Sequence, residues 1–166
     1  MRLHIENEFD ISADRLVELL LDDGFERGLW DSIGFSDVEI LELKKEEGRR
    51  YRKAKVTPQT ELPGFLKKVV GGASGYYEIT DWDIKKRVNK WKTYLSEKMP
   101  GVNIAGDFFV EDLGGGRCKR VVDGEVDVKL PLIGKKIEEF LIKETEKSYE
   151  KINAYIKHWI VEKEKR

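Results

Sequence analysis

The chain has 166 residues, with 31 Lys and Arg against 32 Asp and Glu, which leaves a formal net charge of −1. This length allows one domain with a substantial core, and the balanced charge gives no overall field that would attract a polyanion. The single cysteine, Cys118, excludes a disulfide framework, and the first residues lack the apolar core of a signal peptide. No run approaches the roughly 18 apolar residues of a membrane-spanning helix. We therefore expect one cytoplasmic domain over residues 1–166.

The first third of the chain predicts one strand followed by short helices. Apolar residues alternate over residues 2–10, which indicates a strand. Ser12 is a suitable N-cap for a short buried helix over residues 13–21, and a second short helix or turn is expected over 25–33. Further strands are predicted near 36–45, 48–57, 75–84, 86–96, 103–112 and 117–130.

The last two predicted strands each alternate between a core-facing row and a water-facing row. Gly106 lies in the core-facing row of 103–112, and Gly124 lies in that of 117–130. Because a glycine removes a side chain from the inner face, two neighbouring inward glycines predict a strongly curved sheet. The glycines at 114–116 predict the turn between these strands, since no Lys-Ser or Lys-Thr pair and no helix follows them as in a phosphate-binding loop.

Residues 131–166 predict one long amphipathic helix, which Pro131 can begin. Its apolar stripe consists of Ile133, Ile137, Phe140, Leu141, Tyr149, Ile152, Ile156, Trp159 and Ile160. Thr145 and Ser148 fall on this stripe where larger apolar residues would be expected. Small side chains at these positions suit either a shallow packing contact or the wall of a ligand cavity, and both interpretations stay open.

One connection, residues 58–74, is too long for a hairpin. It contains a Pro-Gly break and then one or two helical turns, with Phe65, Leu66 and Val69 on one side and lysines opposite. Long connections in compact domains are often lids or binding loops. The alternative is an ordinary loop that packs its own apolar residues.

Two segments resemble an uncharacterised bacterial family of the START-like superfamily, which includes pollen-allergen-like proteins, polyketide cyclases and lipid-transfer domains. They are ELPGFLKKVVG over residues 61–71 and DGEVDVKLPLIGKKIE over residues 123–138. The order of predicted elements matches as well. The resemblance implies an α+β helix-grip fold, in which a strongly curved antiparallel sheet of about seven strands wraps around a long C-terminal helix. It also implies one START-like domain with a hydrophobic cavity between sheet and helix, and it brings no catalytic residues.

The sequence offers little chemistry for catalysis or metal binding. His4 and His158 lie at opposite ends of the chain, and neither is at ligand spacing from another histidine or a cysteine. No metal, no cofactor and no catalytic residue is therefore expected. An enzyme of the cyclase or dehydratase type is the alternative, and it would need titratable groups inside the cavity, for which Tyr77, Asp81 and Glu144 are the candidates.

A basic hairpin over residues 44–55 carries seven basic and two acidic residues. Such a run is usually solvated, with charges that protect the sheet edge. This hairpin or residues 63–70 could make a transient contact with a membrane surface. Nucleic acid is not an expected partner, because the hairpin lacks repeated aromatic residues for base stacking. A protein-interaction or chaperone-adaptor module without a cavity, using this hairpin or the outer sheet, is a further alternative.

The favoured function is the binding of a hydrophobic small molecule of lipid, isoprenoid or polyketide type, and transport of that molecule is its extension. Strand alternation predicts that Tyr77 faces inward together with Ile79 and Asp81, and that Trp91 and Thr93 do the same on the next strand. We expect the ligand to contact Phe65, Leu66, Val69, Tyr77, Trp91, Thr93, Phe108, Val126, Leu141, Thr145, Ser148 and Ile152.

Overall fold

The computed structural model describes residues 1–58, 62–70, 75–94 and 101–164, without the side chains of Ser36, Val69 and Val70. Within these residues, seven strands form one antiparallel sheet in the order β1-β7-β6-β5-β4-β3-β2. The strands are β1 (Arg2–Phe9), β2 (Phe35–Glu46), β3 (Arg49–Pro58), β4 (Tyr76–Asp83), β5 (Val88–Tyr94), β6 (Val102–Gly114) and β7 (Arg117–Val128). The helices are α1 (Ala13–Leu20), α2 (Asp23–Ile33), α3 (Gly64–Val70) and α4 (Gly134–Trp159), which continues as a π-helix over Ile160–Glu164.

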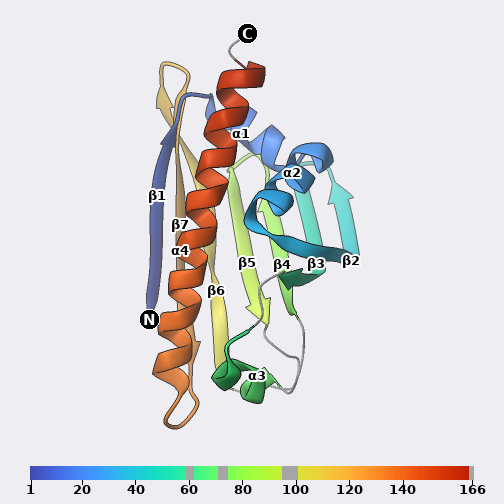
Figure 1. Cartoon of the computed structure of the whole chain (residues 1–166). Coiled ribbons are helices and arrows are strands. Elements are labelled where there is room, and N and C mark those ends of the chain that lie inside the picture. Colours follow the sequence, from blue (N-terminus) through green and yellow to red (C-terminus); the bar gives the residue numbers. More distant parts are fainter. Residues whose placement is uncertain (59–61, 71–74, 95–100, 165–166) are drawn as a thin grey trace.

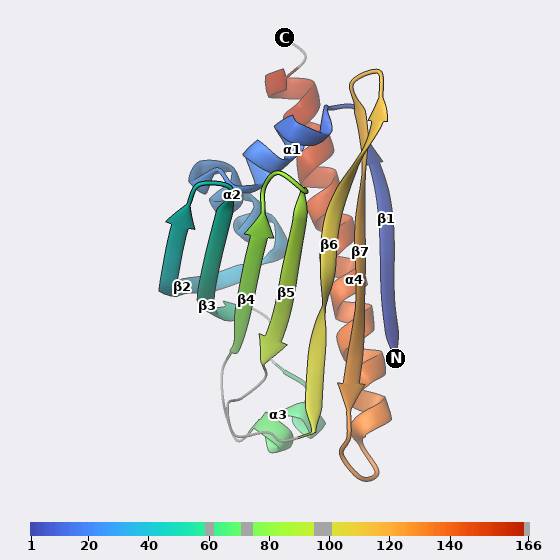
Figure 2. The ribbon, with the colours of Figure 1, turned by 180° about the vertical axis from the view of Figure 1, so that it is seen from behind.

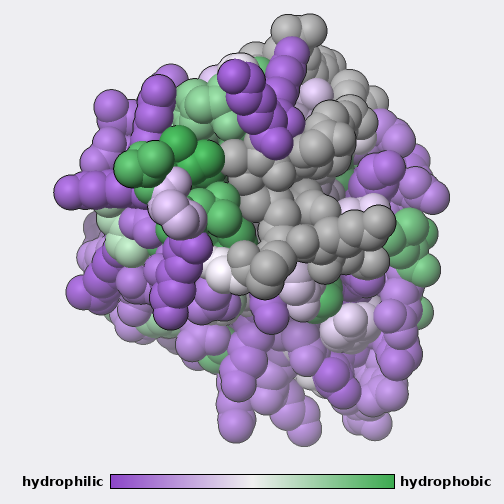
Figure 3. Space-filling view, turned by 90° about the horizontal axis from the view of Figure 1, so that it is seen from below, coloured by the Kyte–Doolittle hydropathy of each residue, from purple (hydrophilic) through white to green (hydrophobic). Residues whose placement is uncertain are grey.

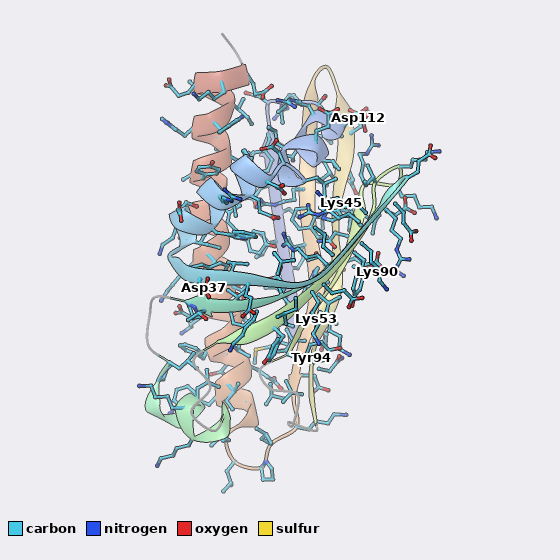
Figure 4. The ribbon with its side chains drawn as sticks, turned by 90° about the vertical axis from the view of Figure 1, so that its right-hand side faces the viewer. Asp37, Lys45, Lys53, Lys90, Tyr94 and Asp112 are labelled. Carbon is cyan, nitrogen blue, oxygen red and sulfur yellow. The ribbon has the colours of Figure 1, made fainter. Side chains whose placement is uncertain are left out.

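All the helices lie on one face of the sheet, and the other face is bare (Figures 1 and 2). The long α4 crosses the inner face, with α1 and α2 near its C-terminal end and α3 near its N-terminal end (Figure 1). From the side, the sheet curves around α4, and Lys90 projects from the opposite side (Figure 4). This arrangement confirms the predicted α+β helix-grip fold, including two short helices after β1.

Side-chain caps fix the two short helices that follow β1. The Ser12 hydroxyl accepts a hydrogen bond from the backbone N–H of Arg15 at 3.2 Å, and the Asp22 carboxylate accepts one from the N–H of Phe25 at 2.9 Å. Helix α2 then ends at Gly34, whose φ of 78° lies in the left-handed region that glycine tolerates. These caps place the buried Phe25 beneath the C-terminal half of α4, where Trp159 packs edge-on at 5.1 Å between ring centroids.

The long helix begins later than predicted, at Gly134 rather than Pro131. Leu132 adopts a φ of 71°, which breaks the helical conformation before it can start. Gly134 also packs directly on the end of β7, where a Cβ would lie 2.1 Å from the carbonyl oxygen of Val128. The tight connection between strand and helix therefore decides the first residue of α4. Within the described ranges, no helix is long and apolar enough to cross a membrane.

The core is divided into two apolar clusters. One lies under α1, α2 and the C-terminal half of α4 and includes Leu16, Phe25 and Ile156. The other lies under α3 and the N-terminal half of α4 and includes Leu66 and Ile137. Partly buried residues of the sheet and of α4 contact both clusters, and the space between the clusters is incompletely filled.

Candidate functional site

A cavity of about 740 Å³ lies between the inner face of the sheet and α4. Leu29, Trp30 and Ile33 of α2 line it near one end, and Leu62 and Leu66 of the α3 segment line it near the other. Most of the remaining wall comes from inward-facing residues of the sheet and from the helix. The sheet thus supplies the floor, α4 supplies one wall, and the short helices close the ends.

Helix α4 presents the predicted gap in its apolar stripe to this cavity. Leu141, Thr145, Ser148 and Ile152 all line it, so the small residues form part of a cavity wall. The Thr145 hydroxyl donates to the backbone carbonyl of Leu141 at 2.7 Å. Because that bond uses the hydroxyl hydrogen within the helix, the methyl group supplies most of what Thr145 offers to a ligand.

The two inward glycines do not add open space, because Trp91 occupies it. Trp91 pairs with Gly106, which in turn pairs with Gly124 on β7. A Cβ built at Gly124 would lie 2.5 Å from the Trp91 ring, so the indole lies over Gly124. The glycines therefore accommodate a large aromatic side chain that lines the cavity.

The structure brings most of the predicted ligand-contacting residues together around the cavity. Those that line it are Leu66, Trp91, Thr93, Phe108, Val126, Leu141, Thr145, Ser148 and Ile152. Phe65 is not among the lining residues and packs edge-on against Phe140 at 5.9 Å between ring centroids. The side chain of Val69 lies outside the described part of the structure.

The prediction that Tyr77 faces the cavity is wrong. The inward-facing residues of β4 are the even-numbered ones, one position away from the predicted row. Tyr76, Glu78, Thr80 and Trp82 line the cavity instead. The buried Trp82 fixes this choice, since its ring packs edge-on against Phe108 at 5.6 Å and cannot be turned to water without losing that contact. In an alternating strand, one buried residue sets the direction of all the others.

Of the three acid–base candidates predicted from the sequence, only Glu144 reaches the cavity wall. Its carboxylate pairs with Lys147 at 3.2 Å at the partly exposed edge of α4. Asp81 accepts two hydrogen bonds from Arg49 at 2.8 Å, and this bond from the guanidinium holds the pKa of the Asp81 carboxyl below its usual range. Asp81 and Tyr77 belong to the outer row of β4.

A charged cluster that the sequence did not predict forms the cavity wall next to α2. Arg50 and Arg52 of β3 both point inward, and the Glu26 carboxylate of α2 accepts hydrogen bonds from both guanidinium groups, at 3.3 Å from Arg50. Glu78 lies 4.0 Å from Arg52 and also lines the cavity. Burial raises the pKa of the Glu78 carboxyl, although the positive charge of Arg52 opposes this shift.

Arg120 is a further charged residue in the wall that the sequence did not predict. It lies two residues before Val122 in the inward row of β7, so extending the alternation of the strand by one step would have found it. The whole residue is buried, and its pKa is lowered to about 10 by the loss of hydration. Tyr149 faces it from α4, and burial raises the pKa of this phenol to about 12.

Within the described residues, no three His, Cys, Asp or Glu side chains converge in a way that could hold a metal ion. The charged groups of the cavity wall include Arg50, Arg52 and Glu78 on neighbouring strands, and Glu26 on α2. They can bind polar atoms of a ligand or transfer a proton, while the surrounding apolar side chains hold its hydrocarbon part.

The order of elements and the cavity between a curved sheet and a long helix define a helix-grip fold. The chain belongs to the family described as protein of unknown function DUF2505, whose model matches residues 4–160. No curated protein matches the chain in sequence.

Solved structures with the same fold come from proteins of different activities. Norcoclaurine synthase from Thalictrum flavum, in complex with dopamine and hydroxybenzaldehyde, is 21% identical with a TM-score of 0.68, over 100% of this chain and 89% of that chain. The Zhui aromatase/cyclase from a Streptomyces species is 20% identical with a TM-score of 0.64, over 99% of both chains. The protein TTHA0849 from Thermus thermophilus is 12% identical with a TM-score of 0.64, over 97% of both chains. Identities this low show a shared fold alone.

Proposed function

We propose that this protein binds a hydrophobic small molecule of lipid, isoprenoid or polyketide type between its sheet and α4. The observation that carries the proposal is the cavity of about 740 Å³, which falls within the usual range for ligand sites. Small side chains at Thr145 and Ser148 leave room on the helix where the stripe would otherwise be filled. Each 100 Å² of apolar ligand surface removed from water would contribute about 2.5 kcal/mol.

Native mass spectrometry of the freshly purified protein tests whether a ligand copurifies. Titration with the neutral fluorophore N-phenyl-1-naphthylamine then tests the cavity itself. Ser148→Phe would fill the cavity from α4, and Glu146→Phe adds the same ring on the exposed side of that helix. We expect at least tenfold weaker binding for Ser148→Phe and wild-type binding for Glu146→Phe. Wild-type binding by a folded Ser148→Phe protein would contradict the proposal.

The α3 segment is proposed to act as the lid over one end of the cavity. Leu66 is fully buried and lines the cavity, whereas Lys67 and Lys68 are exposed. Leu66→Ala would remove most of the apolar anchor of this short helix. In stopped-flow measurements we expect faster release of the fluorophore, and Lys68→Ala should release it at the wild-type rate. Equal rates for all three proteins would show that α3 does not control release.

We also propose that the α3 end docks on an anionic membrane surface, where ligand could be exchanged. Leu132, in the turn before α4, exposes its whole side chain, and Lys67, Lys68, Lys135 and Lys136 are exposed on the neighbouring helices. Figure 3 looks onto this end and shows apolar side chains beside hydrophilic ones. The hairpin at 44–55 suits this role less well, because two of its arginines point into the cavity.

Co-sedimentation with vesicles tests this surface. Leu132→Asp combined with Lys67→Glu and Lys68→Glu should abolish binding to vesicles that contain phosphatidylserine. Lys85→Glu with Lys86→Glu changes the same kind of charge on an exposed turn and should retain it. Equal sedimentation of both variants would refute a specific docking surface, because loss of net positive charge alone would then explain any change.

One observation favours a second candidate function, which is proton-transfer catalysis of the cyclase or dehydratase type. Glu78 faces the cavity, and burial raises the pKa of its carboxyl, which favours the protonated form that could donate a proton to a ligand. The test requires the copurified ligand. Liquid chromatography and mass spectrometry should show its conversion, for example by loss of water, with wild-type protein but not with Glu78→Gln. An unchanged ligand with both proteins would leave binding as the function.

A further inference from the structure

Arg120 is a buried cation for which the described residues provide no anionic partner. The residue is 0% exposed, and its guanidinium carbon lies 4.8 Å from the ring centroid of Tyr149, 5.2 Å from that of Phe9 and 5.8 Å from that of Phe108. Buried arginines are normally paired with a carboxylate, because removing the charge from water is costly. Aromatic faces offset only part of that cost.

Neutral side chains hold the guanidinium of Arg120 in place through one of its three nitrogens. Nη2 donates to the side-chain oxygen of Asn7 on β1 at 2.8 Å and to that of Asn153 on α4. Nε and Nη1 have no hydrogen-bond partner among the residues that the structure describes. They carry three N–H groups between them, and each buried donor without an acceptor costs about 1–3 kcal/mol. The two asparagines therefore orient the group without neutralising it.

The two other inward arginines differ in this respect. Arg50 and Arg52 both contact the Glu26 carboxylate, and Glu78 lies 4.0 Å from Arg52, so each of these arginines has a carboxylate partner within the protein. Arg120 also belongs to the cavity wall, together with Phe108 and Tyr149. Because Arg120 is 0% exposed, an anionic oxygen reaches it only when a covering ring, such as that of Phe108 or Tyr149, turns aside. The oxygen then meets a preoriented cation in a site shielded from water, where charge-assisted hydrogen bonds are strong.

We propose that the ligand of this cavity is an elongated apolar acid whose carboxylate binds Arg120. This inference rests on the proposed binding function and specifies the class of ligand. Val126 lies six residue steps along β7 from Arg120, a distance of about 20 Å along the strand. The hydrocarbon chain then extends over the indole of Trp91, which covers Gly124, toward Val126 and Leu66 at the α3 end. A long-chain fatty acid has the required shape and charge.

The test compares palmitic acid with methyl palmitate, which has the same chain without the charge. Both compounds displace bound N-phenyl-1-naphthylamine from wild-type protein at pH 7.5, below the concentrations at which they aggregate. We expect the acid to bind at least tenfold more tightly than the ester. Arg120→Met should abolish this preference by weakening the acid and not the ester. Arg120→Lys should retain part of it, and Arg117→Gln, on the exposed end of the same strand, should retain all of it.

The outcomes separate the inference from the function on which it rests. If neither compound displaces the fluorophore and the fluorophore itself does not bind, the proposed function fails. If both compounds bind wild-type protein equally well, the function stands and the assignment of Arg120 is overturned. Equal binding of the acid to wild-type and Arg120→Met proteins overturns it as well. The comparison of acid and ester in wild-type protein needs no variant, so it decides the matter even if Arg120→Met does not fold.

Discussion

Gly124→Ala tests whether the inward glycines serve to accommodate Trp91. The added methyl group would lie 2.5 Å from Cζ2 and 2.8 Å from Cη2 of the Trp91 ring, and 2.8 Å from the carbonyl oxygen of Ala105. Real Cβ atoms essentially never approach other atoms this closely, so either the indole or the backbone of β6 must move. The indole is itself confined, because it lies among the partly buried residues that pack against both core clusters.

The expected destabilisation follows from this overpacking. Forcing a methyl group into a packed site costs about 1–3 kcal/mol. For a protein of this size, each kcal/mol lowers Tm by about 2–4 °C, so we expect Tm to fall by roughly 2–12 °C. Thermal unfolding followed by circular dichroism measures this change. The cavity should also change shape as the indole moves, and N-phenyl-1-naphthylamine should bind less tightly than to the wild-type protein.

A double-mutant cycle with Trp91→Leu identifies which contact is responsible. Trp91→Leu alone destabilises by leaving a cavity, but it removes the ring that the new methyl group would strike. Gly124→Ala should therefore cost much less in the Trp91→Leu background than in wild-type protein. If the cost is the same in both backgrounds, the carbonyl of Ala105 is the cause, and the glycine is not required by the indole.

Three further predictions concern charged and titratable groups. Glu26→Ala removes the carboxylate shared by Arg50 and Arg52, and it should lower the free energy of unfolding in urea by about 3–5 kcal/mol. A decrease below about 1 kcal/mol would contradict a stabilising buried salt bridge. Folding raises the pKa of the Glu78 carboxyl above its ordinary 4.5, so the folded protein binds this proton more tightly than the unfolded chain does. The stability of the wild-type protein should therefore fall as pH rises from about 4.5. The Tm advantage of Glu78→Gln should accordingly grow from pH 4.5 to pH 8, whereas a constant difference would refute the assignment. Burial raises the pKa of the Cys118 thiol to about 11, so at pH 8 iodoacetamide should label this thiol only in concentrations of urea that unfold the protein. Labelling of the folded protein would show that β7 opens locally.

The order of elements could be predicted from the sequence because each boundary has a local physical signal. Ser12 and Asp22 cap α1 and α2, and the glycines at 114–116, all with positive φ, form the turn between β6 and β7. The alternation in β6 and β7 continues over a whole strand, so the inward row is determined several times over. These signals are carried by neighbouring residues, and the sequence shows them directly.

Two features depended on contacts between distant parts of the chain and were predicted wrongly. Tyr76 and Tyr77 are adjacent and similar, so the alternation of β4 had no local preference, and the packing of Trp82 on Phe108 decided it. The start of α4 depends on how closely Gly134 approaches the end of β7. Neither contact leaves a trace in the local pattern of polar and apolar residues.

The charged residues of the cavity were missed for a different reason, which bears on the function. Polar patterning assigns arginine to the surface, yet Arg50, Arg52 and Arg120 all occupy inward positions of strands whose other inward residues are apolar. An apolar side chain at each position would fill the core without the loss of hydration that a buried guanidinium suffers. Arg50 and Arg52 are paired with Glu26, which joins α2 to the sheet, and their role can be structural. Among the described residues, the hydrogen-bond partners of Arg120 are the amides of Asn7 and Asn153, so its charge has no carboxylate partner there. Departures from the local rules of folding are expected where a site serves a ligand, and in this protein the departure without internal compensation is at Arg120.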